Sequence, residues 1–157
     1  MLNTPYRQGI SIPLMIAAAT IITEGELVAV DSAGEAVPAT DADAKYLMGR
    51  SETTASPQTP AINNTIVVTR NRQFLLANDA TNPVTQADIG SIVVLTGKNM
   101  VGKFTDGDPA ILGVGALMGV DYNGQVWVEV GSAPIGKIGT SIDAPPRTGD
   151  DTGGGTT

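Results

Sequence analysis

Residues 111–130 read ILGVGALMGVDYNGQVWVEV, and this stretch decides the fold class. Over residues 111–120 apolar side chains alternate with glycines, and a period of two is typical of a strand. Residues 121–124, DYNG, are a strong turn signal, and apolar residues alternate again over residues 125–130. The stretch therefore predicts a β-hairpin. Trp127 is the only tryptophan, and we expect it to anchor the core. The alternative is that it anchors an interface with a partner.

A second hairpin signature lies near the N-terminus. Residues 26–30, ELVAV, predict a strand, and residues 35–37 predict its return. The turn is DSAG at residues 31–34, where Gly34 supplies the positive φ that such a turn needs.

Five further apolar or β-branched runs predict strands, and no stretch has the sustained 3.6-residue pattern of an amphipathic helix. Pro13 interrupts the first run, so that strand is expected at a sheet edge or a bend. The third and fourth runs flank the tripeptide RNR, and we expect them to pair with each other. The five runs are residues 10–16, 46–50, 65–69, 73–76 and 92–95.

A polar segment, NDATNPVTQADIGS at residues 78–91, separates two of these strands. Pro83 favours an extended backbone, and Thr85 can cap a short turn with Asp88 as the partner acid three residues later. Gly90 then ends the turn before the next strand. The segment is therefore interpreted as a connector, and it need not hold a ligand.

Composition agrees with an all-β fold. Hydrophobic residues make up 41% of the 157 residues, enough for one domain with its own core. Charged residues make up only 16%, against about 25% in typical domains. The 19 glycines and 10 prolines indicate short strands joined by tight turns. We predict a small β-barrel or β-sandwich.

The chain divides into three parts by composition. Residues 1–9 are mostly polar and predict an N-terminal arm, and residues 10–131 form the β domain. Residues 132–157 predict an extended linker and a disordered tail rich in Gly, Thr and Asp. Within that part, the short apolar stretch at residues 135–142 is a candidate to dock on the fold.

Charge and missing residue types exclude several functions. The net charge is −7 without a Lys/Arg cluster, which argues against binding to nucleic acid. The chain has no Cys and no His, so disulfides, thiolate nucleophiles, Cys/His zinc sites and His general bases are excluded. The apolar run at residues 10–22 contains Pro13 and is too short to span a bilayer, so it is interpreted as an opening strand rather than a signal peptide.

No motif predicts a cofactor. GKNMVGKF at residues 97–104 approaches a phosphate-binding loop, but Phe104 stands where Ser or Thr would hold magnesium, and a turn follows instead of a helix. We interpret it as two glycine turns around a short strand. The pairs Asp41/Asp43 and Asp106/Asp108 lack the rest of a calcium loop and are interpreted as solvated carboxylates. A hydrolase that uses paired carboxylates remains an alternative, although nothing in the sequence brings two of them together.

Six segments in this order resemble a group of phage and prophage head decoration proteins, also called capsid cement proteins. The resemblance covers roughly residues 10–130, and its motifs mark structural turns rather than chemical sites. The segments are the apolar opening strand, EGELVAVDSAGEAVPATD, YLMGRSE, TIVVTR, QFLLANDATNPVTQADIGSIVVL and LGVGALMGVDYNGQVWVEV.

The resemblance implies a protein without enzymatic activity on the outer surface of an icosahedral head. Such proteins bind the mature shell, often as trimers that bridge capsomers, so the implied partners are the major capsid protein and further copies of the chain. A ligand that binds only the assembled lattice stabilises it by mass action, and bridging adds avidity.

We expect the arm to make the capsid or neighbour contact, because it has apolar and hydrogen-bonding groups but no evident intrachain core. The candidate residues are Asn3, Tyr6, Arg7, Ile10 and Ile12. The alternative is a minor tail or head-fibre adhesion module that binds host-surface glycans. The few aromatic residues, mostly in strand-like runs, count against it because sugars stack on exposed rings.

Overall fold

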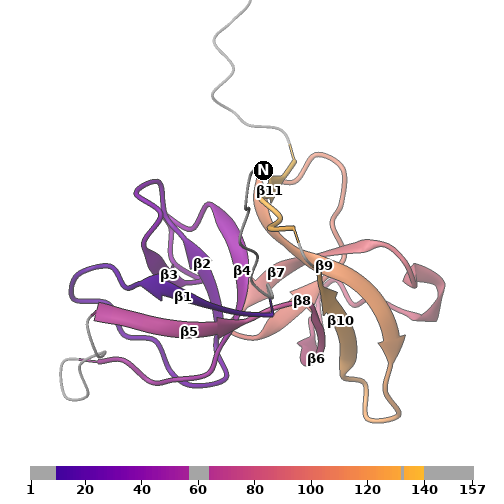
Figure 1. The fold of residues 1–157 in the computed structure, drawn as a ribbon. Coiled ribbons are helices and arrows are strands. Elements are labelled where there is room, and N and C mark those ends of the chain that lie inside the picture. The colour runs from indigo at the N-terminus through magenta and orange to yellow at the C-terminus, as the bar shows by residue number, and fades with distance from the viewer. Residues whose placement is uncertain (1–9, 57–63, 132, 140–157) are drawn as a thin grey trace, which may run out of the picture.

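The fold is all-β, as predicted. The computed structural model describes residues 10–56, 64–131 and 133–139, and these contain strands and the short 3-10 helix η2 (Gln86–Asp88) (Figure 1). The strands of the first sheet are β1 (Ser11–Met15), β2 (Leu27–Val30), β3 (Ala36–Pro38), β4 (Tyr46–Ser51) and β5 (Thr65–Thr69). The strands of the second sheet are β6 (Arg72–Asn78), β7 (Ile92–Gly97), β8 (Met100–Gly102), β9 (Ile111–Val120), β10 (Val126–Val130) and β11 (Lys137–Ile138).

The first sheet is a five-stranded barrel, one of the two architectures that the sequence predicts. Its strand order is β1-β5-β4-β2-β3. A parallel bridge between Ile16 and Ala36 joins the two outer strands, and the Ala17 N–H donates to the Ala36 carbonyl at 3.1 Å. Pro13 lies in β1 opposite Val67, at the edge that the sequence predicts.

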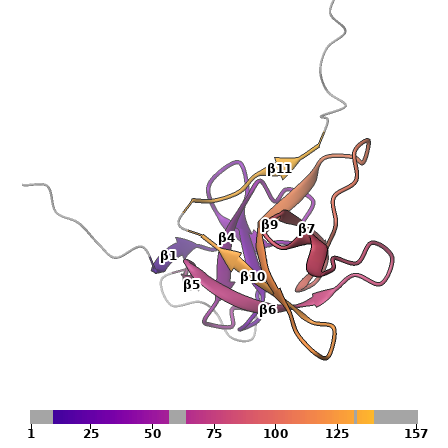
Figure 2. The same ribbon diagram turned by 90° about the vertical axis from the view of Figure 1, so that its right-hand side faces the viewer.

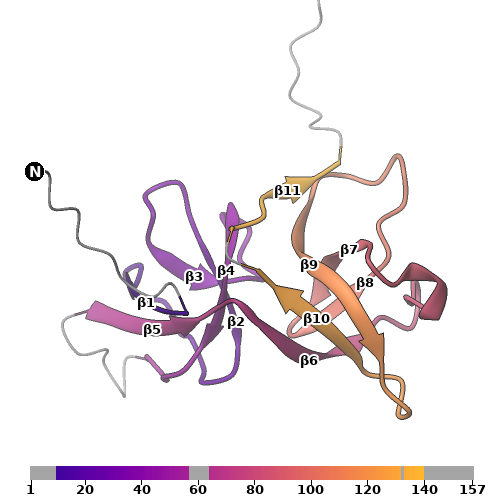
Figure 3. The same cartoon turned by 45° about the vertical axis from the view of Figure 1, so that its right-hand side comes forward.

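The second sheet also closes on itself. Its order is β10-β6-β8-β7-β9-β11, and β10 pairs with β9 as well as with β6. Strands β6, β8, β7, β9 and β10 therefore form a second ring, and β11 adds to its outside along β9. The two barrels lie side by side (Figures 1 and 3).

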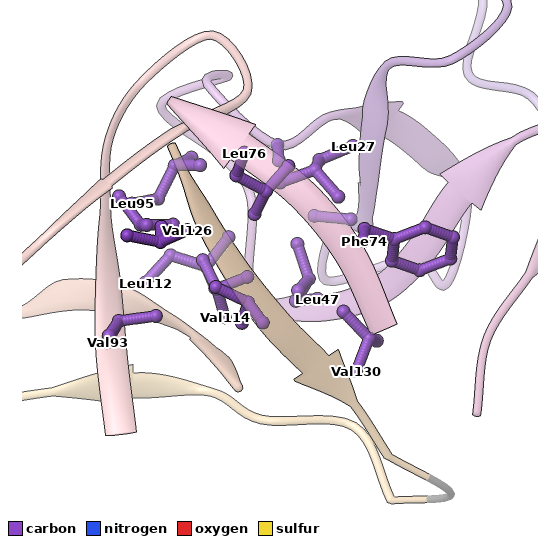
Figure 4. Close-up of a cluster of buried hydrophobic side chains, with 14 of the residues drawn as sticks. Leu27, Leu47, Phe74, Leu76, Val93, Leu95, Leu112, Val114, Val126 and Val130 are labelled. Carbon is purple, nitrogen blue, oxygen red and sulfur yellow. The ribbon is translucent and has the colours of Figure 1, made fainter. Parts of the chain in front are cut away.

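The barrels share a core because β2 is buried on both faces. Val28 points into the first barrel, whereas Leu27 and Ala29 join the larger apolar cluster with the second barrel (Figure 4). Burial of one such Leu or Val side chain contributes about 1.5–3 kcal/mol. Eighteen buried residues from both barrels form that larger cluster, so the barrels are expected to fold as one unit.

The expected pairing of residues 65–69 with 73–76 is wrong. β5 pairs with β1 and β4, whereas β6 pairs with β10 and β8. The chain passes from one barrel to the other through Arg70 and Asn71, and the positive φ of Asn71 (58°) redirects it (Figure 3). A short polar link can either reverse the chain or carry it into a new sheet, and local sequence does not distinguish the two.

Both predicted hairpins and the predicted cap before residue 86 are confirmed. Strands β2 and β3 form the first hairpin, with Gly34 at φ 78°, and β9 and β10 form the second. Before η2 the Asp88 carboxylate accepts a hydrogen bond from the Thr85 N–H at 2.8 Å, and Gly90 follows with φ 90°. The interpretation of residues 97–104 is only partly right, because the short strand β8 is present but Gly97 ends β7 and Gly102 ends β8, so the two glycines lie in strands and not in turns.

The second barrel continues past residue 131. Strand β11 pairs with the start of β9, and the Leu47 N–H of β4 donates to the Ile135 carbonyl at 2.9 Å. The predicted docking of this apolar stretch is confirmed for residues 135–139. Gly113 makes room for it, because a Cβ there would lie 2.6 Å from Ile135 Cγ2. The predicted arm (residues 1–9) and the tail beyond residue 139 lie outside the described residues.

Candidate interaction surface

The predicted contact residues fall in different places. Asn3, Tyr6 and Arg7 lie outside the described residues. Ile10 is half-buried, and its carbonyl accepts a hydrogen bond from the Arg70 N–H at 2.8 Å, which fixes the start of β1 at the link between the barrels. Ile12 is buried in the core of the first barrel, so its side chain supports the fold there.

Trp127 lies on the outer surface, so the expectation of a core anchor is wrong. Val126, Val128 and Val130 point inward from β10, and alternation directs Trp127 and Glu129 outward. Trp127 keeps 40% of its surface exposed. The sequence VWVEV already indicates the outward position, because Trp127 and Glu129 are two residues apart and their side chains therefore point to the same face of the strand.

Trp127 belongs to an apolar outer face on the second barrel, the part that Figure 2 turns toward the reader. Its cross-strand neighbours are Leu75 on β6 and Gly119 on β9. A bulge follows Gly119 in the pairing of β9 with β10, and Met118 is exposed there. We call the exposed side chains of Leu75, Met118 and Trp127, on three neighbouring strands, the apolar face.

A polar side chain joins the barrels where they meet. Asn99, between β7 and β8, accepts a hydrogen bond from the Leu27 N–H at 2.9 Å through its amide oxygen. Its amide nitrogen donates to the Gly25 carbonyl at 2.8 Å, and its own carbonyl accepts from the Ala77 N–H at 3.0 Å. Asn99 therefore contacts strands of both barrels, and its φ of 48° suits Asn better than most residues.

Two adjoining hollows lie along this junction. The first has a volume of about 310 Å³ and lies between Leu27 of the first barrel and β6, with Asn99 and Trp127 in its lining. The second has a volume of about 460 Å³ and reaches Ile10 and Ser11 at the start of β1. Both are lined by Arg50, Gln73 and Phe74. We call the two hollows together the junction groove.

The charged groups of the junction groove are two arginines and one glutamate. The Arg50 guanidinium lies 5.2 Å from the centre of the Phe74 ring, a cation–π contact, and donates to Glu52 at 2.8 Å. This hydrogen bond from Arg50 holds the pKa of Glu52 below its ordinary value of 4.5, against a smaller opposing effect of burial. Arg72 is exposed at the outer end of the groove.

Several carboxylates and lysines outside the groove form contacts within local structure. Asp41 accepts the Asp43 N–H, and Asp108 accepts the Thr105 N–H. Within the described ranges, no three acidic, His or Cys side chains group as they would around a metal ion. The lysines of residues 97–104 form ion pairs, Lys98 with Glu26 at 3.7 Å and Lys103 with Asp88 at 3.1 Å.

Comparisons with protein families, curated proteins and solved structures find no match for this chain. The part of the chain that the structure describes contains no helix long and apolar enough to cross a membrane. The candidate site is therefore interpreted from its own geometry, and that geometry is a surface with apolar and hydrogen-bonding groups.

Proposed function

We propose that the protein is a viral capsid decoration protein. It binds the outer surface of the mature phage head, bridges capsomers and stabilises the shell, and it has no enzymatic activity. The apolar face with Trp127 at its centre is the observation that carries this proposal. Exposed aromatic and aliphatic side chains on neighbouring strands form the kind of surface that protein partners cover.

The two-barrel fold suits a role that depends on binding. Closed sheets leave few free strand edges, and a core shared by two barrels supports a rigid surface. A rigid surface loses little conformational freedom when it binds, so more of the interaction energy is available to stabilise a lattice. The proposed partners are the major capsid protein and further copies of this chain, with a trimer favoured by the sequence resemblance.

Co-sedimentation tests the proposal. Purified protein is mixed with mature heads that lack it and, separately, with unexpanded proheads. We expect saturable binding to mature heads, at a copy number that is a simple multiple of the capsomer sites. Absence of binding to both particles would overturn the proposal.

A glycan-binding adhesion module is the second candidate, and one observation favours it. Tyr122 is 97% exposed in the turn that precedes β10, and Trp127 is exposed on the same hairpin. Exposed rings can stack on sugars. A glycan array with the full chain tests this, with Trp127→Ala as the matched variant. Reproducible binding that the variant loses would support the adhesion module, and an array without binding would exclude it for the sugars displayed.

A further inference from the structure

Strand β6 has an unpaired edge within the second barrel. Its residues Arg72 to Leu76 all pair with β10 on one side. On the other side, β8 pairs only with Ala77 and Asn78. The ring of the second barrel is therefore incomplete along most of β6.

The unpaired edge presents backbone groups of Gln73 and Leu75. The N–H groups of Ala77 and Asp79 point toward β8, where they donate to Asn99 and Val101. Since alternate residues of a strand direct their backbone groups to opposite edges, Gln73 and Leu75 direct theirs to this same edge. No described residue pairs with them there. An unpaired edge of this kind accepts an added strand.

Asn99 indicates the width of the space beside that edge. This one residue bonds to β6 through its backbone and to the residues at the start of β2 through its side chain. At this point the gap between the barrels is therefore as wide as a single chain segment, the one that contains Asn99. Beyond it the gap opens into the junction groove, along Leu75 and Gln73.

The groove walls select the chemistry of an occupant. Leu75 and Trp127 supply apolar surface in the first hollow, Arg72 lines the second, and Arg50 lines both. Glu52 is the only acidic residue among the described lining residues, so the groove carries a net charge of about +1 in a chain of net charge −7. This charge favours a partner with a carboxylate near Arg72.

We propose that the junction groove receives an extended, carboxylate-bearing segment of the capsid subunit, which adds to β6 as a strand. This inference rests on the proposed decoration function and assigns one contact surface to it. Residues 1–9 of the chain fit less well, because their only charged side chain is that of Arg7, which the arginines of the groove would repel.

Replacement of one backbone donor tests the added strand. Gln73→Pro removes an N–H that β10 does not use, whereas Gln73→Ala removes the same side chain and keeps the N–H. Each full-length variant is titrated on mature heads, and thermal melting checks that it folds. We expect Gln73→Pro to bind about tenfold more weakly and Gln73→Ala to bind within about twofold of the original chain. Arg72→Gln is expected to weaken binding about threefold and to reduce its salt dependence.

The outcomes separate the two proposals. If the original chain does not bind heads, both fail. If it binds and folded Gln73→Pro binds equally well, only the added strand fails. If Gln73→Pro is too unstable to fold, hydrogen exchange of the original chain tests the added strand instead. The backbone amides of Gln73 and Leu75 must then become protected from exchange when the chain binds heads.

Two other occupants would also overturn the inference. If Gln73→Pro changes self-association in sedimentation velocity without changing head binding, a second copy occupies the groove. If the Gln73 and Leu75 amides are protected in the free full chain but not in a variant that begins at residue 10, the chain's own arm occupies it.

Discussion

The amide oxygen of Asn99 accepts a hydrogen bond from the backbone N–H of Leu27 at 2.9 Å, across 72 positions of sequence. The same side chain donates to the Gly25 carbonyl, so a single residue of the second barrel satisfies two backbone groups of the first. The barrels are thus joined by a specific polar contact as well as by their shared apolar core.

Asn99→Gly is expected to lower the free energy of unfolding by about 1–3 kcal/mol. Glycine accepts the positive φ at this position, so the variant removes the two side-chain hydrogen bonds without adding backbone strain. Urea denaturation followed by Trp127 fluorescence measures the change. Asn82→Gly, at an exposed loop position, is the control and should stay within about 1 kcal/mol. Equal effects at both positions would show that Asn99 does not join the barrels energetically.

Two glycines of the β9–β10 hairpin differ in the space available for a side chain. At Gly115 a Cβ would overlap the Glu129 carbonyl of β10, whereas at Gly119 the nearest atom is Trp127 Cδ1 at 3.6 Å. We expect Gly115→Ala to destabilise the protein by about 3 kcal/mol or more and Gly119→Ala by less than about 1 kcal/mol. Thermal melting of the two variants measures the difference. Similar melting temperatures would contradict the close approach of β9 and β10.

Local patterns predicted most of the strands, because short-range signals determine them. The alternation of residues 111–130, the glycine turn at Gly34 and the Thr85–Asp88 cap all act over a few residues, and all are present. The second barrel could not be predicted in this way. It depends on where β6 finds its partners, and those partners lie some 50 residues later in β10.

The candidate surface was only partly accessible from sequence. The outward position of Trp127 follows from the parity of VWVEV, although its rarity and size favoured a core position. The free edge of β6 has no sequence signal, because it results from pairing that stops at Ala77. Asn99 likewise looks like an ordinary turn residue until the fold brings Leu27 beside it.

Asp88 is expected to stabilise the fold near neutral pH, and part of the loss of stability in acid is expected to come from its protonation. The hydrogen bond from the Thr85 N–H, with a smaller contribution from Lys103, holds the pKa of Asp88 below its ordinary value of 3.8. A carboxyl whose pKa is lower in the folded state stabilises the fold above its unfolded pKa, and this contribution is lost as pH falls through the folded pKa. Asp88→Asn should therefore be less stable than the original chain at pH 6, and the gap should narrow below pH 3.8.

The denaturation midpoints of Asp88→Asn and of the original chain, determined at pH 6, 4 and 3, measure this difference in stability. Lys103→Met is the matched variant, because it removes the ion pair but keeps the hydrogen bond from Thr85. The stability of Lys103→Met should therefore still decrease in acid, by most of the amount seen for the original chain. A gap between Asp88→Asn and the original chain that stays constant from pH 6 to pH 3 would refute the assignment.

Substitutions at two neighbouring residues of β10 should distinguish effects on head binding from effects on folding. Trp127 faces outward and Val126 is buried, so Trp127→Ser is expected to cost about 1 kcal/mol of stability and Val126→Ser about 3 kcal/mol. If the apolar face binds the capsid, Trp127→Ser should still fold and should bind mature heads at least about tenfold more weakly. Circular dichroism melting and head co-sedimentation measure the two quantities on the same preparations. A folded Trp127→Ser variant with unchanged head binding would exclude Trp127 from the contact, both on the apolar face and in the lining of the junction groove.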